Sequence, residues 1–317
     1  MKIFRHLSPR LKNITRDSIL AIGMFDGLHL GHQRILKTVL RQARQQGCRS
    51  GVLTFFPHPD RVLNHQPVLL IQTTEQKLEY FRQLGLDYCL LISLDRKLAA
   101  MSGRDFVDQV LKKTLQVREV VVGRNFRFGR HRLCGVRELK NFGSKLGIKI
   151  LDLNPVRKSG QKISSSLIRR YLEKGEVEKA WKLLGKPYEI KGLVVKGRGL
   201  GRKLGFPTIN LKTKNEILPA GVFLSLVKTG KRILPAVSNI GFRPTFGSKK
   251  PSVEAHLLDF SGQLYNRSVS LYLLKKLRDE KKFPDHQALR RQIEKDVSRA
   301  RRLFSSARIR SQLNLDF

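Results

Sequence analysis

The sequence predicts an α/β protein of two domains, the first built on a parallel sheet and the second on an antiparallel barrel or sandwich. Up to about residue 185, short apolar runs alternate with segments of helical periodicity, which is the pattern of consecutive strand and helix units. From Tyr188 onward, the apolar residues come in short alternating runs separated by Gly, Pro and Asn, which is typical of antiparallel sheets. The chain length of 317 residues fits two domains of ordinary size.

The elements of the first domain follow in order along the chain. A strand at 18–23 runs into a helix at 31–46, where Ile35, Val39 and Ala43 form one apolar stripe. Further strands are expected at 51–56, 88–94, 119–123 and 148–153. Further helices are expected at 74–84, 104–115 and 136–146. Such a sheet carries helices on both faces and ligand-binding loops at the carboxyl ends of its strands.

The pattern changes after two short helices, expected at 165–173 and 177–184, so the domains should span 1–185 and 186–317. The strands of the second domain are expected at 188–195, 222–227, 233–238, 253–258 and 269–274. A C-terminal helix is expected at 286–304, because its apolar residues lie near one face.

The charge of the chain limits its partners. Lys and Arg number 63 and Asp and Glu number 25, which gives a net charge of +38. Both domains are basic, whereas a nucleic-acid-binding tail concentrates its charge in one block. A basic surface combined with phosphate-bearing substrates is therefore favoured, and no specific nucleic-acid partner is expected.

The location of the protein follows from its apolar segments and its cysteines. The longest apolar runs have strand length, well short of the roughly 18 residues that a membrane helix needs. The first residues lack the continuous apolar core of a secretion signal. Cys48, Cys89 and Cys134 are odd in number and form no CxxC pair, which argues against a disulfide framework and a zinc site. We expect a cytoplasmic protein without a membrane partner and with at most weak homo-oligomerisation.

The junction after the first strand carries the first candidate site. It reads Gly23-Met-Phe25-Asp26-Gly-Leu-His29-Leu-Gly31-His32. The free N–H groups of a helix start favour an anion, and both histidines can donate hydrogen bonds to oxygens that gain charge in a transition state. A pair of surface histidines and a metal site are the alternatives. A zinc site is disfavoured, because Asp26 is the one nearby carboxylate or cysteine that could complete it.

A second phosphate motif is expected later in the chain. An HxGH sequence after the first strand resembles the signature of the nucleotidyltransferase superfamily, which includes class I aminoacyl-tRNA synthetases. The segment Lys162-Ile-Ser164-Ser165-Ser166-Leu-Ile-Arg169 suits the second motif, because it places hydroxyls at a helix start and an arginine one turn later. Taken alone, it is an ordinary capped basic helix.

Two further loops follow strands of the first domain. One contains Phe55, Pro57 and His58, and the other contains Asn125, Phe126 and Phe128. Asn125 can make a directed polar contact, and the phenylalanines offer faces on which a flat heterocycle can stack. Phe126 and Phe128 are two residues apart, so on an extended chain they face the same side, and at least one of them is expected in the core.

The second domain has two candidate segments. A glycine-rich stretch that contains Gly201 and Gly205 leads into Thr208 and Asn210, which face the same way on an extended chain and can share one magnesium ion. A basic hairpin turn is an equal alternative. Glu254 lies within an otherwise apolar strand and is a plausible base for a substrate hydroxyl, or else a solvent-facing strand residue. The segment 239–246 is expected to form a turn.

Together these segments resemble the bacterial bifunctional riboflavin kinase/FAD synthetase family. The resemblance covers nearly the whole chain, from GMFDGLHLGHQ through TFFPHP, VGRNFRFG, ISSSLIR, LLGKPYEIKGLVV, GRKLGFPTINL, NIGFRPTF and VEAHLLDF to LRDEKKF. It implies an FMN adenylyltransferase on a Rossmann-like nucleotidyltransferase domain, followed by a riboflavin kinase on a six-stranded antiparallel β-barrel. ATP, riboflavin and FMN would be the substrates, and Mg²⁺ would serve both reactions.

The resemblance also implies a role for each matching residue. His29 and His32 would be catalytic in adenylyl transfer, and Glu254 would take the proton from the riboflavin hydroxyl. Thr208 and Asn210 would hold magnesium and phosphate. ATP and its phosphates would also be bound by Gly23, Phe25, Asp26, Gly31, Asn125, Ser164, Ser165, Arg169, Gly201 and Gly205. The flavin would be bound by Phe55, Pro57, His58, Phe126 and Phe128.

Two other functions remain open from the residues alone. The chain could be another HxGH nucleotidyltransferase or a synthetase-like protein that uses its basic second domain to hold RNA, although the motifs of the second domain argue against this. It could also be a basic nucleic-acid-binding module without catalytic activity, in which case its affinity would fall steeply with salt.

Overall fold

The computed structural model describes residues 1–63, 67–158, 160–241 and 251–306. The chain divides into two compact units, Met1–Ser165 and Ser166–Phe317. Each unit has its own sheet and its own hydrophobic core. The functional boundary near residue 185 stays a prediction.

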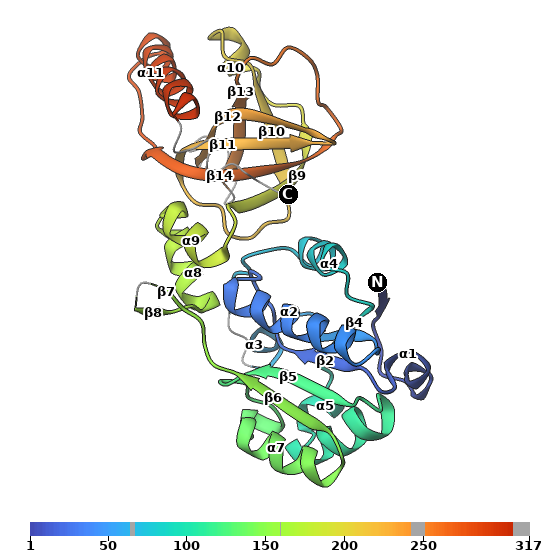
Figure 1. The fold of residues 1–317 in the computed structure, drawn as a ribbon. Coiled ribbons are helices and arrows are strands. Elements are labelled where there is room, and N and C mark those ends of the chain that lie inside the picture. Colours follow the sequence, from blue (N-terminus) through green and yellow to red (C-terminus); the bar gives the residue numbers. More distant parts are fainter. Residues whose placement is uncertain (64–66, 159, 242–250, 307–317) are drawn as a thin grey trace. The chain divides into compact units, whose positions relative to one another are not determined.

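The first unit is built on a parallel sheet. Its strands are β1 (Lys2–Phe4), β2 (Ile19–Ile22), β3 (Ser50–Phe55), β4 (Tyr88–Ile92), β5 (Glu119–Gly123) and β6 (Lys149–Leu153). They lie in the order β1-β4-β3-β2-β5-β6, and every neighbouring pair is parallel (Figure 1). The order changes direction between β2 and β5, and open α/β sheets bind their ligands beyond the carboxyl ends of the strands at such a point.

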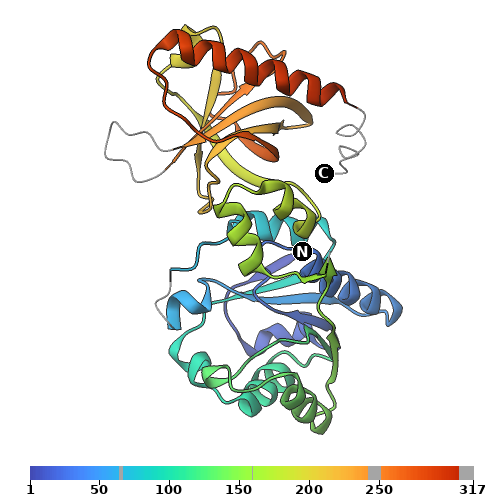
Figure 2. The ribbon, with the colours of Figure 1, turned by 90° about the vertical axis from the view of Figure 1, so that its left-hand side faces the viewer.

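Helices cover both faces of this sheet (Figures 1 and 2). They are α1 (Lys12–Thr15), α2 (Leu30–Gln45), α3 (Pro59–Leu63), α4 (Thr74–Gln83), α5 (Arg96–Ala100), α6 (Gly103–Asp105) and α7 (Val136–Lys145). Alternate residues of β2 explain the two layers: Leu20 and Ile22 belong to one hydrophobic core, and Ile19 and Ala21 belong to the other. The prediction of a sheet with helices on both faces is confirmed.

The helix expected at 104–115 differs in its geometry. After α6, the segment η2 (Phe106–Thr114) is a π-helix. The wider turn buries adjacent pairs of apolar residues, Phe106 with Val107 and Val110 with Leu111. Short elements that the sequence did not reveal are β1, α1, α3, α5, the turns η1 (Pro9–Leu11) and η3 (Arg130–Arg132), and the hairpin of β7 (Arg157–Lys158) with β8 (Gln161–Lys162).

The second unit contains a closed six-stranded antiparallel barrel, which decides between a barrel and a sandwich. Its strands are β9 (Tyr188–Val195), β10 (Thr208–Thr213), β11 (Gly221–Thr229), β12 (Arg232–Gly241), β13 (Ser252–Leu257) and β14 (Ser268–Arg278), in the order β10-β13-β12-β11-β14-β9. Its helices are α8 (Ser165–Glu173), α9 (Val177–Leu184), α10 (Leu200–Lys203) and α11 (His286–Ser305). The turn expected at 239–246 is wrong for its first three residues, which belong to β12 and pair with β13 through Gly241. The other residues of the expected turn lie outside the described part of the chain.

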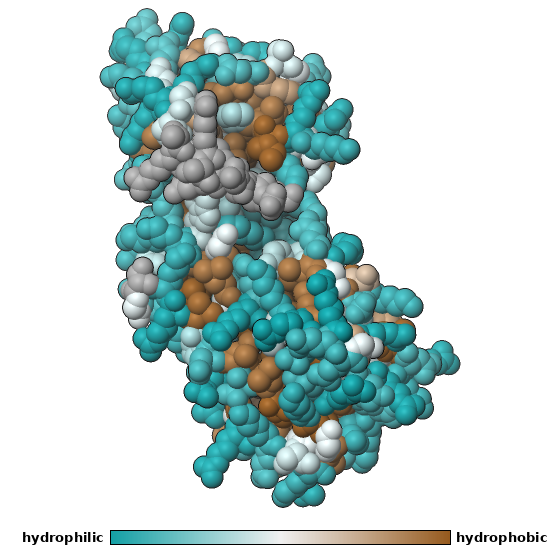
Figure 3. Space-filling model, in the orientation of Figure 1, coloured by the Kyte–Doolittle hydropathy of each residue, from teal (hydrophilic) through white to brown (hydrophobic). Residues whose placement is uncertain are grey.

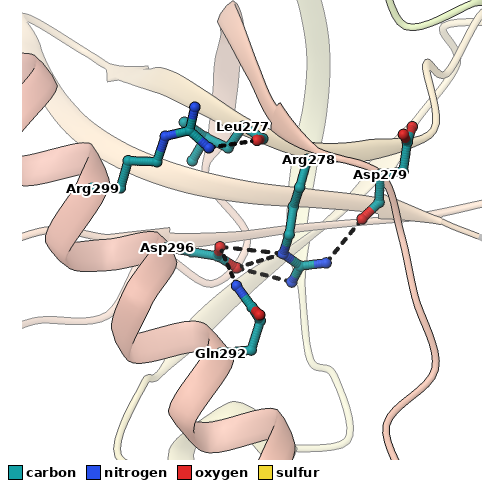
Figure 4. A network of polar contacts seen from close by, with 6 residues as sticks. All are labelled: Leu277, Arg278, Asp279, Gln292, Asp296 and Arg299. Carbon is teal, nitrogen blue, oxygen red and sulfur yellow. Dashed lines mark hydrogen bonds and ion pairs between the residues drawn. The ribbon is translucent and has the colours of Figure 1, made fainter.

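The C-terminal helix α11 lies along the outside of the barrel (Figure 2). Ile293, Val297 and Ala300 pack into a core shared with β11 and β14. A polar network also fixes the helix: Arg278 donates to the buried carboxylate of Asp296 from Nε at 2.9 Å and from Nη2 at 2.9 Å (Figure 4). The helix is therefore joined to the end of β14 by a buried ion pair as well as by apolar contact.

The surface is largely hydrophilic on the face drawn in Figure 3, with hydrophobic residues in separate patches. None of the helices in the described part of the chain is both long enough and apolar enough to cross a bilayer. The three cysteines are present as free thiols.

Candidate active sites

The loop between β2 and α2 presents the first candidate site at the carboxyl edge of the sheet. Phe25, Gly27 and Leu28 all have positive φ angles, of 52°, 80° and 45°. Two of these residues carry side chains that disfavour this conformation, and such strain is common at functional sites. At Gly31, an added Cβ would lie only 3.0 Å from Cε1 of His29. A side chain at this position would therefore press on the His29 ring, which accepts a hydrogen bond at the start of α2.

The two histidines of the HxGH motif form one stacked pair. Their ring centroids lie 3.7 Å apart with an interplanar angle of 16°. Nδ1 of His29 accepts a hydrogen bond from the backbone N–H of His32 at 3.3 Å, so the neutral ring carries its proton on Nε2. Nδ1 of His32 is buried and has no hydrogen-bond partner among the described residues.

Both imidazoles are held in the neutral form. Burial lowers the pKa of His29 to about 4. Burial lowers the pKa of His32 well below its ordinary value, and repulsion from the protonated form of His29 and from the Lys77 ammonium group lowers it further. At neutral pH the pair therefore offers neutral N–H donors and no net charge of its own.

These histidines should make the stability of the first unit depend on pH. In the unfolded chain their pKa is about 6.5, so between pH 6.5 and about 4 the unfolded chain binds a proton that folded His29 does not. The free energy of unfolding therefore falls as the pH falls through this window, by about 3 kcal/mol for His29 alone. We expect His29→Asn, which keeps an acceptor at the start of α2, to lose correspondingly less stability on acidification.

Urea unfolding across this pH window, followed by circular dichroism, measures the difference. The single tryptophan, Trp181, lies on α9 in the second unit, so its fluorescence is the internal control and should not distinguish variant from wild type. Identical acid sensitivity of the first unit in both proteins would contradict the prediction.

The serine motif meets the histidine loop, as the pairing of the two motifs predicted. The hydroxyl of Ser165 donates to the backbone carbonyl of Asp26 at 2.9 Å. Ser164 and Ser165 line the same cavity as His29 and His32. A hydroxyl-bearing helix start and the histidine pair thus face one space.

This cavity has a volume of about 1170 Å³, which is large enough for a nucleotide together with a second substrate. It is lined by most of the residues singled out from the sequence of the first domain: Gly23, Phe25, His29, Gly31, His32, Phe55, His58, Asn125, Phe126, Phe128, Ser164 and Ser165. The loops after β2, β3 and β5 supply most of them, as expected for an open α/β sheet.

The two aromatic residues after β5, Phe126 and Phe128, differ in their burial. Phe126 and Phe128 stack with centroids 5.6 Å apart and an interplanar angle of 12°. Phe128 is 7% exposed and belongs to the core beside Phe106, whereas Phe126 is only partly buried. The expectation that at least one of the two is in the core is confirmed, and Phe126 is the one with surface left for a ligand.

Three predicted residues of the first site lie elsewhere. The carboxylate of Asp26 is buried and accepts a hydrogen bond from the backbone N–H of Ile71 at 3.0 Å. It therefore joins the histidine loop to the segment before α4. Pro57 is exposed and does not line the cavity. Arg169 lies on α8 within the second unit, and its role toward ATP stays a prediction.

The second candidate site lies on β10 and β13 of the barrel. Asn210 pairs directly with Glu254 in the strand register. The hydroxyl of Thr208 donates to Oε2 of Glu254 at 3.5 Å. All three side chains are partly exposed, whereas Val253 and Ala255 on either side of Glu254 are buried. The three oxygen-bearing side chains therefore share one accessible patch.

The glycine-rich segment packs directly against this patch. It forms the short helix α10, and an added Cβ at Gly201 would lie 3.2 Å from Oγ1 of Thr208. An added Cβ at Gly197 would collide with the side-chain amide of Asn210. Gly205 has a φ of +88°, and no atom of the described residues lies within 4 Å of a Cβ added there. Side chains at the first two positions would push the segment away from Thr208 and Asn210.

Two residues near these sites were not found by sequence reasoning. Lys77 on α4 is buried, and its ammonium group reaches the histidine loop. His256 lies two residues beyond Glu254 on β13, and its Nδ1 is 2.8 Å from the carbonyl oxygen of Pro207. Residues two apart on a strand face the same side, so the position of His256 relative to Glu254 could have indicated it. Lys77 carries no such signal, because lysine on an amphipathic helix is ordinarily solvated.

Comparison with known proteins gives consistent matches in both units. Residues 11–167 match the family model of FAD synthetase, and residues 184–304 match the family model of riboflavin kinase. A bifunctional riboflavin kinase/FMN adenylyltransferase of Bacillus subtilis (strain 168) is 35% identical over 311 residues, which cover 96% of this chain and 98% of that protein. The protein of the same description from Escherichia coli (strain K12) is 34% identical over 308 residues, which cover 96% and 98%.

A crystal structure titled as a macrolide-efflux protein from Streptococcus pneumoniae shares the fold. It matches with a TM-score of 0.86 and 26% sequence identity, over 95% of this chain and 99% of that one. Its title names a different activity, but the two family models and the two relatives agree with one another and together span nearly the whole chain. This chain belongs to the bifunctional riboflavin kinase/FMN adenylyltransferase family.

Proposed function

We propose that the first unit transfers the adenylyl group of ATP to FMN in the cavity at the histidine pair, and that the second unit phosphorylates riboflavin at the patch of Thr208, Asn210 and Glu254. The family of the chain supports both reactions. The observation that carries the residue assignment is the convergence of the histidine loop and the serine motif on one cavity. Neither motif contributes to the barrel.

In adenylyl transfer, a phosphate oxygen of FMN attacks the α-phosphorus of ATP, and the bond to the bridging oxygen of pyrophosphate breaks. Negative charge grows on the leaving pyrophosphate and on the α-phosphate oxygens. His29 can donate from Nε2 because its Nδ1 already accepts from the backbone N–H of His32. Nδ1 of His32 lies in the same site and has no hydrogen-bond partner in the described part of the chain. Donors fixed before the reaction stabilise such charge without reorganisation.

Phe126 and the loop of Phe55 and His58 would hold the flavin ring of FMN. Phe126 keeps exposed surface for stacking while Phe128 supports it from the core. Ser164, Ser165 and Asn125 would bind the ATP that is placed beside it. Stacking holds a flat ring by its face and leaves the phosphate tail free to reach the histidines.

In riboflavin phosphorylation, Glu254 would accept the proton of the ribityl hydroxyl as the oxygen attacks the γ-phosphorus of ATP, with ADP leaving. Thr208 donates to Glu254, which leaves the carboxylate with further lone pairs for the substrate proton. The N–H groups of the glycine-rich segment and Asn210 would position the phosphates, because phosphoryl transfer depends chiefly on positioning and charge neutralisation.

The residues of the second site fit magnesium as a cofactor. Hydroxyl, amide and carboxylate oxygens are the ligands that this hard cation prefers, usually together with phosphates, and Thr208, Asn210 and Glu254 bring these three types together. Thr208 and Asn210 would hold the ion, which would neutralise phosphate charge when bound. The high positive charge of the chain is assigned to a generally basic surface, and no specific nucleic-acid partner is proposed.

Incubation of the chain with riboflavin, ATP and Mg²⁺, followed by chromatographic separation of the flavins, tests the proposal. Both FMN and FAD should appear, and supplied FMN should give FAD without riboflavin. Amino-acid-dependent exchange of pyrophosphate into ATP, with no flavin product, would instead indicate a synthetase-like enzyme.

A further inference from the structure

Lys77 is a buried cation beside the adenylyl-transfer site. It lies on α4, a helix that contributes no predicted site residue, and it is only 7% exposed. Removing an ammonium group from water costs several kcal/mol unless other groups compensate, and burial lowers the pKa of Lys77 accordingly. An apolar side chain would fill the same space without this desolvation cost. The charge of Lys77 therefore points to a role beyond packing.

The contacts of Lys77 converge on the histidine loop. Its Nζ donates to the carbonyl oxygen of Met24 at 3.2 Å and to Oγ1 of Thr54 at 3.3 Å. Thr54 in turn donates from Oγ1 to the same Met24 carbonyl at 3.1 Å. The three groups form a closed triangle that joins the loop after β2 to the end of β3.

Charge reinforces the same connection. The carboxylate of Asp26 is the acidic group whose field favours the charged form of Lys77. Asp26 belongs to the loop itself and is buried. The loop therefore holds a hydrogen-bond acceptor of Lys77 at Met24 and an acidic group that favours its charged form at Asp26, on either side of the strained residue Phe25.

Phe25 connects this anchor to the reacting groups. Its ring packs edge-on against the His32 ring, with centroids 5.3 Å apart. A shift of the backbone at Met24 or Asp26 would thus move Phe25 and, with it, the His32 ring that stacks on His29. Such a shift affects catalysis strongly, because a misplacement of about 1 Å can cost about 100-fold in rate.

We propose that Lys77 is a positioning residue for adenylyl transfer, which fixes the histidine loop through its hydrogen bonds to Met24 and Thr54. It does not touch the substrates. This inference rests on the adenylyltransferase function proposed for the first unit.

Kinetics of FAD formation from FMN test the proposal in the full-length chain. Lys77→Met keeps the length of the side chain and removes its charge and both hydrogen bonds. We expect kcat to fall about 10- to 100-fold, with a change of less than about threefold in KM for ATP, because Lys77 positions the histidines without binding the nucleotide. Riboflavin phosphorylation by the same preparation should be unchanged.

Two further variants separate positioning from simple loss of stability. Gln76→Leu changes the buried residue next to Lys77 and removes the hydrogen bond that the Gln76 side chain makes in the capping box of α4. It therefore weakens the same helix without changing a contact to Met24. The kcat of this variant should stay within about threefold of wild type. Thr54→Val removes the second donor to Met24 without changing size. In a double-mutant cycle, the fold-change in kcat of Lys77→Met/Thr54→Val should differ at least threefold from the product of the two single fold-changes, because substitutions of residues in contact have non-additive effects.

The outcomes are decisive in either direction. Independent, multiplicative effects of the two substitutions, or an equal loss in Gln76→Leu, would show that Lys77 only stabilises the fold and would overturn the proposal. Wild-type kcat in Lys77→Met would overturn it as well. Failure of the adenylyltransferase assignment itself is distinguishable, because the wild-type chain would then form no FAD from FMN.

Discussion

Replacing His32 by Ala should abolish FAD synthesis by this chain while leaving riboflavin phosphorylation near the wild-type rate. The His32 ring stacks on His29, and its buried Nδ1 has no hydrogen-bond partner within the described ranges of the chain. Removing one preorganised donor from a site that stabilises developing charge costs about 10²- to 10³-fold in rate. The barrel contains neither histidine of the motif, so the rate of riboflavin phosphorylation should not change.

Parallel assays with riboflavin and with FMN measure the two reactions in one preparation. His32→Asn is a useful second variant, because it retains a polar group and disturbs the packing against Phe25 less than Ala does. His6→Ala is the matched control, since His6 is an exposed histidine of the same unit that lies outside the cavity. Unchanged conversion of FMN to FAD in both His32 variants would remove the histidine pair from the mechanism.

The sequence was most informative where local pattern and tertiary structure agree. The strands β2 and β4 are continuous apolar runs, β3 and β5 each contain a shorter one, and α2 carries a clear apolar stripe, so these elements could be predicted. β1 has only three residues, which is too short for a periodic signal. Five of the six barrel strands follow from alternation, whereas β10 was not among the predicted strands. Closure of the barrel depends on the pairing of β9 with β10 and β14, which no local pattern contains.

The site could be predicted as motifs but not as contacts. The sequence places His29 and His32 after a strand, yet the bond from Ser165 to the Asp26 carbonyl joins residues far apart in the chain. The same limit applies to Lys77, whose partners lie on two other elements. The exposed position of Pro57 also depends on tertiary structure, since its neighbour His58 is buried.

The complementary substitution, Glu254→Gln, should abolish riboflavin phosphorylation while FMN supplied to the protein is still converted to FAD. Glutamine keeps the shape of the side chain and an oxygen that can accept from Thr208, but it cannot take up the hydroxyl proton as a carboxylate does. Loss of a general base costs about 10²- to 10⁴-fold. Because the side chain is partly exposed on β13, the change should leave the barrel folded.

The contrast between the two substrates is what makes this experiment informative. With riboflavin as substrate, Glu254→Gln should yield neither FMN nor FAD, because the second reaction depends on the product of the first. With FMN as substrate, FAD should form at the wild-type rate, since His29 and His32 lie in the other unit. Glu294→Gln is the control, because Glu294 is an exposed glutamate on α11 of the same unit. If Glu254→Gln kept the kinase activity and lost adenylyl transfer, the two active sites would have been assigned to the wrong units.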